Sequence, residues 1–217
     1  MWVADAPELR RGAGRADNLR AEAGMEASGG RQGGGERLFL AVELPDDARD
    51  RLAEHLRDAP GGGRLPGRAV APASWHLTLR FLGDTPPDRR AAVVRAMREA
   101  DPGAGFTLGF GGLGAFPRPA RATVLWLGVE EGAERLGALA TLAEDAARRA
   151  GFAAEERPFS AHLTLSRIRP AQDVRPLLER IPPFRERIRV DAVVLFRSHL
   201  GPGGARYEAV ERFPLGG

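Results

Sequence analysis

The chain has 217 residues, of which 43% are hydrophobic and 28% are charged, a composition that suits one medium-sized globular domain. The absence of cysteine excludes disulfides and thiolate metal sites, and no apolar run approaches the ~20 residues that span a bilayer. All 32 basic residues are arginine, but the net charge is only +3, which weakly indicates an anionic partner. With no secretory signal at the N-terminus, we expect a cytoplasmic protein.

Residues 1–35 differ in composition from the rest of the chain. They are rich in glycine, alanine and arginine, and residues 28–35 alone contain five glycines. Such a segment buries too little apolar surface to offset the entropy lost on ordering. We therefore expect a disordered N-terminal extension over 1–35, with Met25 as an alternative start, and an ordered domain over 36–217.

The first half of that domain mixes strands and helices. A run of apolar residues predicts a buried strand over 38–44, followed by an amphipathic helix from about Asp46. The next strand is predicted over 75–82. Thr85 is then expected to cap a helix that has proline at its first position and runs to about Ala100.

The second half continues this mixture. A long helix is predicted over 131–150, with Gly151 as its C-terminal cap. Several neighbouring strands lack a helical crossover between them, which favours antiparallel pairing and an α+β fold. The remaining predicted elements are strands over 106–113, 122–129, 162–168, 188–197 and 205–212, and a short helix over 174–180.

One tetrapeptide, His-Leu-Thr-Leu, occurs at His76 and again at His162. On a strand, alternation with a period of two places each histidine on one face with Thr78 or Thr164, and the leucines on the other. A single such histidine is usually an ordinary polar residue. Two copies that divide the ordered chain into similar halves instead predict a pseudo-twofold arrangement, in which both motifs face one cleft.

Four segments of the chain resemble the 2H phosphoesterase superfamily. They lie over 37–45, 75–83, 157–167 and 196–207, and the last resembles the bacterial and archaeal RNA 2′,3′-cyclic phosphodiesterases, also called 2′-5′ RNA ligases. The resemblance covers roughly 36–215. It implies an α+β fold of two pseudo-symmetric lobes around a central cleft, each a mostly antiparallel sheet with helices on the outside.

The resemblance also implies a reaction, the hydrolysis of RNA 2′,3′-cyclic phosphate ends to 2′-phosphomonoesters without a cofactor. It assigns His76 as proton donor to the leaving ribose oxygen and His162 as proton acceptor from water, although the residues alone leave the two roles interchangeable. The hydroxyls of Thr78 and Thr164 can hydrogen-bond the non-bridging phosphate oxygens.

A third phosphate-binding candidate is Arg167, whose guanidinium suits bidentate recognition of phosphate. It lies five residues after His162, an odd offset that on an ideal strand points away from the cleft, so a bend or a strand end is required. Arg80 and Arg197 are weaker candidates for the same role.

The remaining aromatic and histidine candidates carry less weight. Phe39 or Phe159 can stack on a base, with packing in the core as the alternative interpretation. His55, on a helix, and His199, in a C-terminal loop, are expected to be non-catalytic.

Several other functions are weighed against this one. A metal site is not expected, because the motifs lack carboxylates and no HExxH pattern is present. The absence of lysine excludes a ligase that adenylylates lysine. Left open are 2′-5′ RNA ligation, a small-nucleotide cyclic phosphodiesterase and a non-enzymatic RNA-end-binding module. We expect a monomer that binds RNA cyclic phosphate termini or nucleoside cyclic phosphates and no membrane.

Overall fold

The structure is a computed structural model, and it describes residues 35–60, 63–201 and 204–216. The predicted N-terminal extension therefore lies outside the described residues except for its last residue, and so does Met25. In the described ranges no helix is long and apolar enough to cross a membrane.

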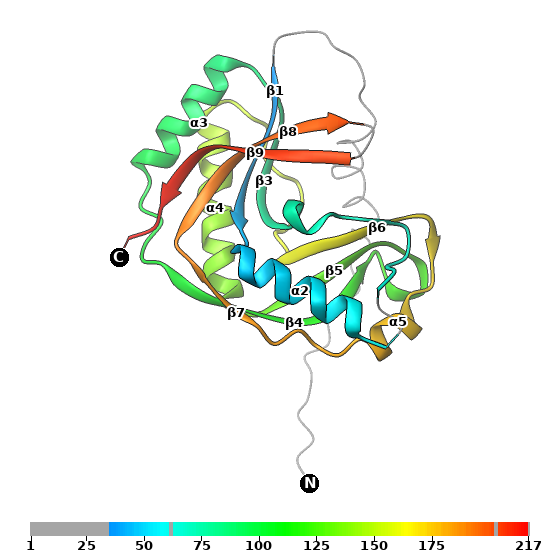
Figure 1. Cartoon of the computed structure of the whole chain (residues 1–217). Helices are drawn as coiled ribbons and strands as arrows, with labels where there is room; N and C mark the ends of the chain where they lie inside the picture. The colour runs from blue at the N-terminus through cyan, green and yellow to red at the C-terminus, as the bar shows by residue number, and fades with distance from the viewer. Residues whose placement is uncertain (1–34, 61–62, 202–203, 217) are drawn as a thin grey trace.

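Two antiparallel sheets form the body of the molecule (Figure 1). The first has the strand order β3-β1-β8-β9, and the second has the order β2-β6-β5-β4-β7. The predicted α+β class with antiparallel pairing is confirmed. The strands of the first sheet are β1 (Glu36–Glu43), β3 (His76–Thr85), β8 (Ala192–Gly201) and β9 (Gly204–Pro214). Those of the second are β2 (Arg68–Ala69), β4 (Phe106–Phe116), β5 (Ala122–Glu131), β6 (His162–Gln172) and β7 (Arg187–Val190).

The two sheets correspond strand by strand. The first histidine motif opens β3 and the second opens β6, and each of these strands pairs with an antiparallel neighbour, β1 or β5. The strands β3 and β6 also approach one another where the two sheets meet. The pseudo-symmetric lobes are thus confirmed, with one exception. Strand β2 extends the second sheet beyond β6, whereas β3 is the edge strand of the first sheet.

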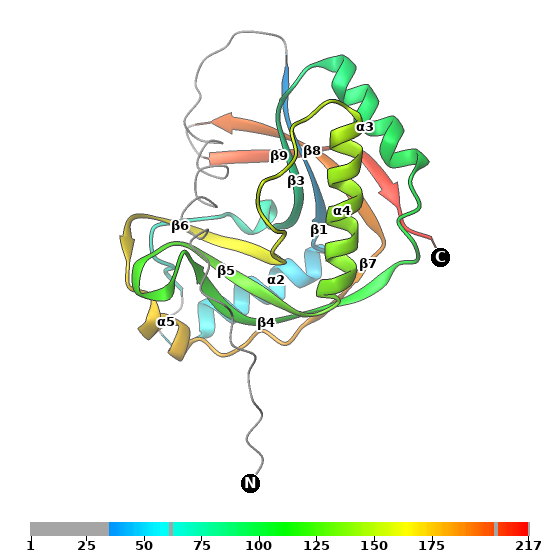
Figure 2. The ribbon, with the colours of Figure 1, turned by 180° about the vertical axis from the view of Figure 1, so that it is seen from behind.

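The helices cross between the lobes. Helix α4 follows β5 of the second sheet but packs on β3 and on α3, as Figure 2 shows from behind. Helix α2 follows β1 of the first sheet but lies over the second sheet in both views (Figures 1 and 2). There the His55 Nε2 donates to the carbonyl oxygen of Pro182 at 2.9 Å. The helices are α2 (Asp46–Asp58), α3 (Pro87–Glu99), α4 (Ala133–Arg149) and α5 (Arg175–Arg180), with short 3₁₀ turns η1 (Pro72–Ser74) and η2 (Pro119–Arg121).

A single hydrophobic core joins the two sheets. Leu40 and Leu77 contribute from the first sheet, and Leu127 and Leu163 from the second. A smaller cluster covers the opposite face of the first sheet and contains Phe39, Ala41, Val194 and Phe196, with Phe81 and Tyr207 against it. Strand β1 is therefore buried on both faces, which explains its unbroken apolar sequence.

The predicted cap of helix α3 is wrong. Thr85 is not a helix cap but the buried last residue of β3, and its Oγ1 donates to the carbonyl oxygen of Gly83 at 3.0 Å. Pro86 is the N-cap of α3, so prolines end the strand and begin the helix through backbone geometry alone. At the other long helix, Gly151 follows α4 with a φ of +84°, as expected for a glycine that ends a helix.

The predicted strand over 188–197 is two strands. The chain leaves the second sheet with β7 and enters the first with β8, and Asp191 lies between them. Val190 and Ala192 are both buried, so the alternation of apolar residues continues through the crossing and conceals it. The two-residue strand β2 was not predicted.

Candidate active site

The histidine motifs alternate between the core and one shared hollow. Their four leucines are buried, as the period of two requires: Leu77, Leu79, Leu163 and Leu165. Their four polar residues are half-buried and face the same space between the sheets, here named the central hollow. It is lined by Val70, Ser74, His76, Thr78, Phe81, His162, Thr164, Arg167 and Tyr207.

Both histidine rings are anchored in the same way. The Nδ1 of His76 lies 2.8 Å from the carbonyl oxygen of Ser74, and the Nδ1 of His162 lies 2.8 Å from that of Ser160. A carbonyl oxygen can only accept, so each Nδ1 carries its proton and Nε2 is the nitrogen that can exchange one. The sequence signal for this anchor is a serine two residues before each motif, although the backbone and not the hydroxyl makes the bond.

Aromatic side chains flank both rings. The His76 ring lies 4.8 Å from Phe39 and 5.0 Å from Tyr207 between centroids, and the His162 ring meets the edge of Phe116 at 5.1 Å. Phe39 is only 1% exposed, so it packs in the core beside His76 and is not available to a base. Of the aromatic contacts of these rings, sequence analysis named only Phe39.

A β-bulge follows the threonine of each motif. In β3 the register with β1 skips Leu79, and in β6 the register with β5 skips Leu165. One extra residue reverses the alternation, so the fifth residue after each histidine turns toward the central hollow. In β3 this residue is Phe81, and in β6 it is Arg167. The bulge is the bend that the interpretation of Arg167 as a cleft residue required.

The two weaker arginine candidates have structural partners. Arg80 forms ion pairs with Glu144 at 2.5 Å and Glu155 at 3.6 Å, which joins β3 to α4 and to the segment after it. Arg197 pairs with Glu36 and with Glu208. Neither belongs to the described lining of the central hollow.

The other two histidines also lie outside the hollow. His55 bonds the segment after α5, and the Nε2 of His199 lies 2.8 Å from the carboxylate of Glu208. This hydrogen bond, and then the charge of Arg197, holds the pKa of Glu208 below its usual value. His199 lies on β8 and not in a C-terminal loop as predicted.

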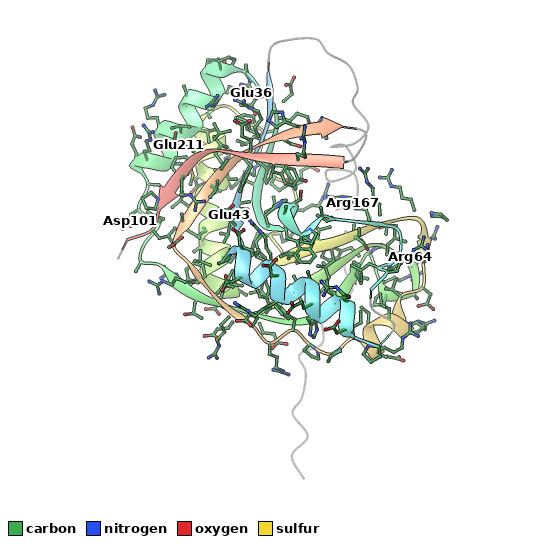
Figure 3. The ribbon with its side chains drawn as sticks, in the orientation of Figure 1. Glu36, Glu43, Arg64, Asp101, Arg167 and Glu211 are labelled. Carbon is green, nitrogen blue, oxygen red and sulfur yellow. The ribbon has the colours of Figure 1, made fainter. Side chains whose placement is uncertain are left out.

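The central hollow continues into a pocket on either side. One, the side pocket, has a volume of about 250 Å³, shares Thr78, Phe81 and His162 with the hollow and reaches α4. Phe159, 36% exposed, forms part of its apolar wall. The other, the basic pocket, shares Arg167 with the hollow, and Figure 3 shows Arg167 between β6 and the end of β9. It is lined by Arg68, Ala69, Val70, Ala71, Ser74, Arg167, Gly204, Ala205 and Tyr207.

The charges along this groove are unequally distributed. None of the described residues that line the central hollow or the basic pocket is acidic. The acidic residues of the side pocket are Glu144 and Glu155, and Arg80 pairs with both. Across the described part of the chain, no three His, Cys, Asp or Glu side chains are grouped to hold a metal ion. The basic pocket thus offers an anion Arg68 and Arg167 beside the imidazoles, and the side pocket adds Arg157 to the paired Arg80.

Comparison with known proteins identifies relatives of the whole folded region. The RNA 2′,3′-cyclic phosphodiesterase of Escherichia coli is 33% identical over 182 residues, which cover 83% of this chain and 97% of the relative. That of Geobacillus stearothermophilus is 33% identical over 183 residues, and the match spans 82% of this chain but only 56% of the longer relative. The solved structure of E. coli LigT complexed with 3′-AMP matches with a TM-score of 0.70 and 31% identity, over 83% of this chain and 98% of that one.

A family model agrees with these relatives. The model described as the 2′-5′ RNA ligase superfamily matches residues 39–202. This range contains both histidine motifs, both bulges and Arg167. Since the match covers well over half of the chain, the protein belongs to the 2′-5′ RNA ligase superfamily.

Proposed function

We propose that the protein hydrolyses RNA 2′,3′-cyclic phosphate ends to 2′-phosphomonoesters by acid–base catalysis with two histidines. The observation that carries the proposal is the pair of imidazoles, each anchored through Nδ1 on a strand that borders the central hollow. The E. coli and G. stearothermophilus relatives carry the name of this activity. Two threonines and Arg167 beside the histidines suit the charge of the substrate.

Each proton has a defined route in this mechanism. His162 removes a proton from water through Nε2, and the resulting hydroxide attacks phosphorus. The bond from phosphorus to O3′ breaks as His76 donates the proton of its own Nε2 to that oxygen, which leaves the phosphate on O2′. His162 therefore gains a proton from water while His76 loses one to O3′, and exchange with solvent restores both.

The carbonyl anchors fit both protonation states of the rings. Nδ1 keeps its proton whether the ring is neutral or charged, so the bond to Ser74 or Ser160 persists while Nε2 gains or loses a proton. Each ring thus keeps its orientation through the cycle. The anchors are equivalent in the two motifs, so the assignment of His76 as acid and His162 as base rests on the family resemblance.

The transition state carries negative charge on the non-bridging oxygens. Thr78 and Thr164 lie two residues after their histidines on the same face, where their hydroxyls can donate to those oxygens. Arg167 adds a fixed positive charge with two parallel donors. These donors are held by strands, so little reorganisation accompanies the reaction.

The proposal is tested with nucleoside 2′,3′-cyclic phosphates and identification of the product isomer. We expect the 2′-phosphate as sole product and the same rate after exhaustive chelation of divalent ions. A 3′-phosphate product would overturn the direction of cleavage, and a rate restored by one added metal would overturn the two-histidine mechanism.

Parallel assays with a 5′-hydroxyl RNA and with ADP-ribose 1″,2″-cyclic phosphate separate hydrolysis from ligation and from small-nucleotide cleavage. Binding of cyclic ends without turnover would leave the RNA-end-binding module as the function.

We also propose that the protein acts as a monomer in the cytoplasm and that residues 1–35 take no part in catalysis. In support, the two histidines, the two threonines and Arg167 of the proposed mechanism all come from one chain and lie well after residue 35. The absence of cysteine fits a reducing compartment. A chain that begins at Glu36 should therefore retain the activity, and sedimentation should give the mass of one chain.

A further inference from the structure

The unpredicted strand β2 carries an arginine beside the proposed phosphate site. Arg68 lies directly opposite Arg167 in the antiparallel pair β2–β6, and both side chains line the basic pocket. Residues opposite one another in such a pair have Cβ atoms about 5 Å apart, and like charges in these positions disfavour pairing. Two guanidinium groups beside a pocket without described acidic lining favour an anion there.

The backbone is adapted to hold Arg68 at this position. Gly67, just before it, has a φ of +74°, and a Cβ on it would lie 2.3 Å from the carbonyl oxygen of Arg167. Only glycine therefore allows β2 to approach β6 so closely. Beyond β2, the amide of Val70 donates to the carbonyl oxygen of Leu165 at 2.8 Å. The two-residue strand is thus fixed to β6 at both ends.

The guanidinium of Arg68 reaches across the groove toward the first sheet. A Cβ on Gly204, the first residue of β9, would lie 2.7 Å from the Nη2 of Arg68. The side chain therefore spans the basic pocket from β2 to β9. Because Arg167 lines both this pocket and the central hollow, Arg68 lies one position further from the catalytic histidines along the same groove.

We propose that Arg68 binds the phosphodiester group on the 5′ side of the nucleotide that carries the cyclic phosphate. This inference rests on the proposed function. In an RNA end, that phosphate is separated from the cyclic phosphate by one ribose, and the two arginines are likewise neighbours along the groove. The side pocket, with Phe81 and Phe159, lies on the other side of the hollow and suits the base. Arg68 thereby favours the end of a polynucleotide over a single nucleotide.

The test compares three substrates with wild-type protein and with Arg68→Gln. They are a nucleoside 2′,3′-cyclic phosphate with a free 5′-hydroxyl, a dinucleotide with the same cyclic end, and that dinucleotide with a neutral methylphosphonate linkage. Wild-type kcat/KM should favour the charged dinucleotide over the other two by about tenfold, the scale of one hydrogen bond to a charged group. Arg68→Gln should abolish this ratio, and rising salt should reduce it only in wild type.

Arg64→Gln is the matched control. Arg64 is an exposed arginine in the loop before β2 and does not belong to the described lining of the groove (Figure 3). Its replacement removes the same charge from the same loop and should leave the substrate ratio as in wild type. Equal melting temperatures of the two variants show that both are folded.

The outcomes separate the two proposals. No hydrolysis of any cyclic end by wild type would overturn the proposed function. Hydrolysis of all three substrates with equal kcat/KM would leave that function intact and overturn the role of Arg68. An equal loss on all three substrates in Arg68→Gln would also overturn it, because Arg68 would then act only by positioning Arg167. A ratio lost equally in Arg64→Gln would assign the preference to the general charge of the loop.

Discussion

The two motif strands, β3 and β6, share the same backbone geometry but carry different side chains into the central hollow. In both, the histidine is anchored to a carbonyl two residues earlier, and a bulge follows the threonine. The bulge turns Phe81 into the hollow from β3 and Arg167 from β6. At this position the two motif strands differ only in the side chain, because the bulge gives Phe81 and Arg167 the same place relative to their histidines.

The neighbouring strands extend this difference. The outer edge of β3 borders the side pocket, with Phe159 in its wall and its acidic groups paired to Arg80. The outer edge of β6 is occupied by β2, which adds Arg68 to the basic pocket. One end of the groove thus suits an apolar base and the other an anion. Under the proposed function, the two imidazoles form a symmetric pair in an asymmetric groove, so we expect the substrate to bind in one orientation.

The largest expected effect tests the symmetric part. His76→Ala and His162→Ala should each lower kcat on a cyclic phosphate by roughly 10²–10⁴-fold, the usual range for loss of a general acid or base. The double variant should lose far less than the product of the two single losses, because both groups serve one transition state. Steady-state kinetics on one substrate measure all three, and the wild-type pH profile should be bell-shaped.

A change of leaving group distinguishes the two histidines. A substrate whose leaving oxygen needs no protonation should restore the rate of His76→Ala and leave His162→Ala slow. Rescue of His162→Ala instead would show that His162 is the proton donor and His76 the proton acceptor, with the two-histidine mechanism unchanged. Losses below about tenfold in both single variants, short of the usual range, would refute the paired-histidine mechanism.

The next effect concerns the residue that differs between the bulges. Arg167→Gln should lower kcat/KM by roughly 10²-fold, the scale of one fixed transition-state donor. Arg167→Lys should recover only part of this loss, because an ammonium restores the charge but not two parallel donors. Arg169→Gln, two residues further along β6, removes an equal charge from an exposed position outside the described lining of the groove. If this control lowers kcat/KM as much as Arg167→Gln does, the loss comes from the net charge of the protein and not from the position of Arg167 after the bulge.

A smaller effect is expected at the corresponding aromatic residue. Phe81→Leu should raise KM for nucleoside cyclic phosphates by about tenfold, within the range for one lost stacking contact with a base. Ribose 2′,3′-cyclic phosphate, which has no base, should respond much less to this variant. Phe159→Leu is compared in the same assays. A larger KM effect at Phe159 than at Phe81 would place the base further from the hollow.

The smallest effect is expected at a histidine outside the groove. The pKa of Glu208 is lowered chiefly by its hydrogen bond from His199, so this contact stabilises the fold above the unfolded-state pKa of Glu208 and is lost as pH falls through the lowered value. The pair is exposed, and His199→Gln should cause only a small loss of melting temperature at neutral pH, which disappears in acid. Its kcat should equal that of wild type. A substantial loss of kcat would bring His199 into the mechanism.

Sequence analysis recovers the parts of this site that obey a local period. The alternation of His-Leu-Thr-Leu suffices to place both histidines and both threonines on one face, and the odd offset of Arg167 requires a bend or a strand end if this residue is to face the cleft. The same offset applied to His76 points to Phe81, which sequence analysis did not consider. The ends of the strands were harder to predict from the sequence. Thr85, for example, is a good helix cap by residue type, but it is buried at the end of β3.

Other features depend on contacts between distant segments. Tyr207 comes from β9, at the opposite edge of the first sheet from β3, and its ring reaches His76 across the face of that sheet that also carries Phe39. A two-residue strand such as β2 has no periodicity to detect, and its position follows from the close approach of Gly67 to β6. The switch at Asp191 from one sheet to the other leaves the apolar pattern unchanged. These features can be recognised only in the folded structure, because they depend on contacts between segments far apart in the sequence.

The crossed helices imply that the lobes cannot separate. Because α4 packs on β3 and α2 lies over the second sheet, each half of the chain completes the core of the other. A fragment that ends after β3 would expose the surface that α4 covers, so neither half is expected to fold alone, and unfolding should be one cooperative transition. We therefore expect β3 and β6 to keep their relative position when substrate binds. The spacing of the two imidazoles is consequently set when the chain folds, before any substrate arrives.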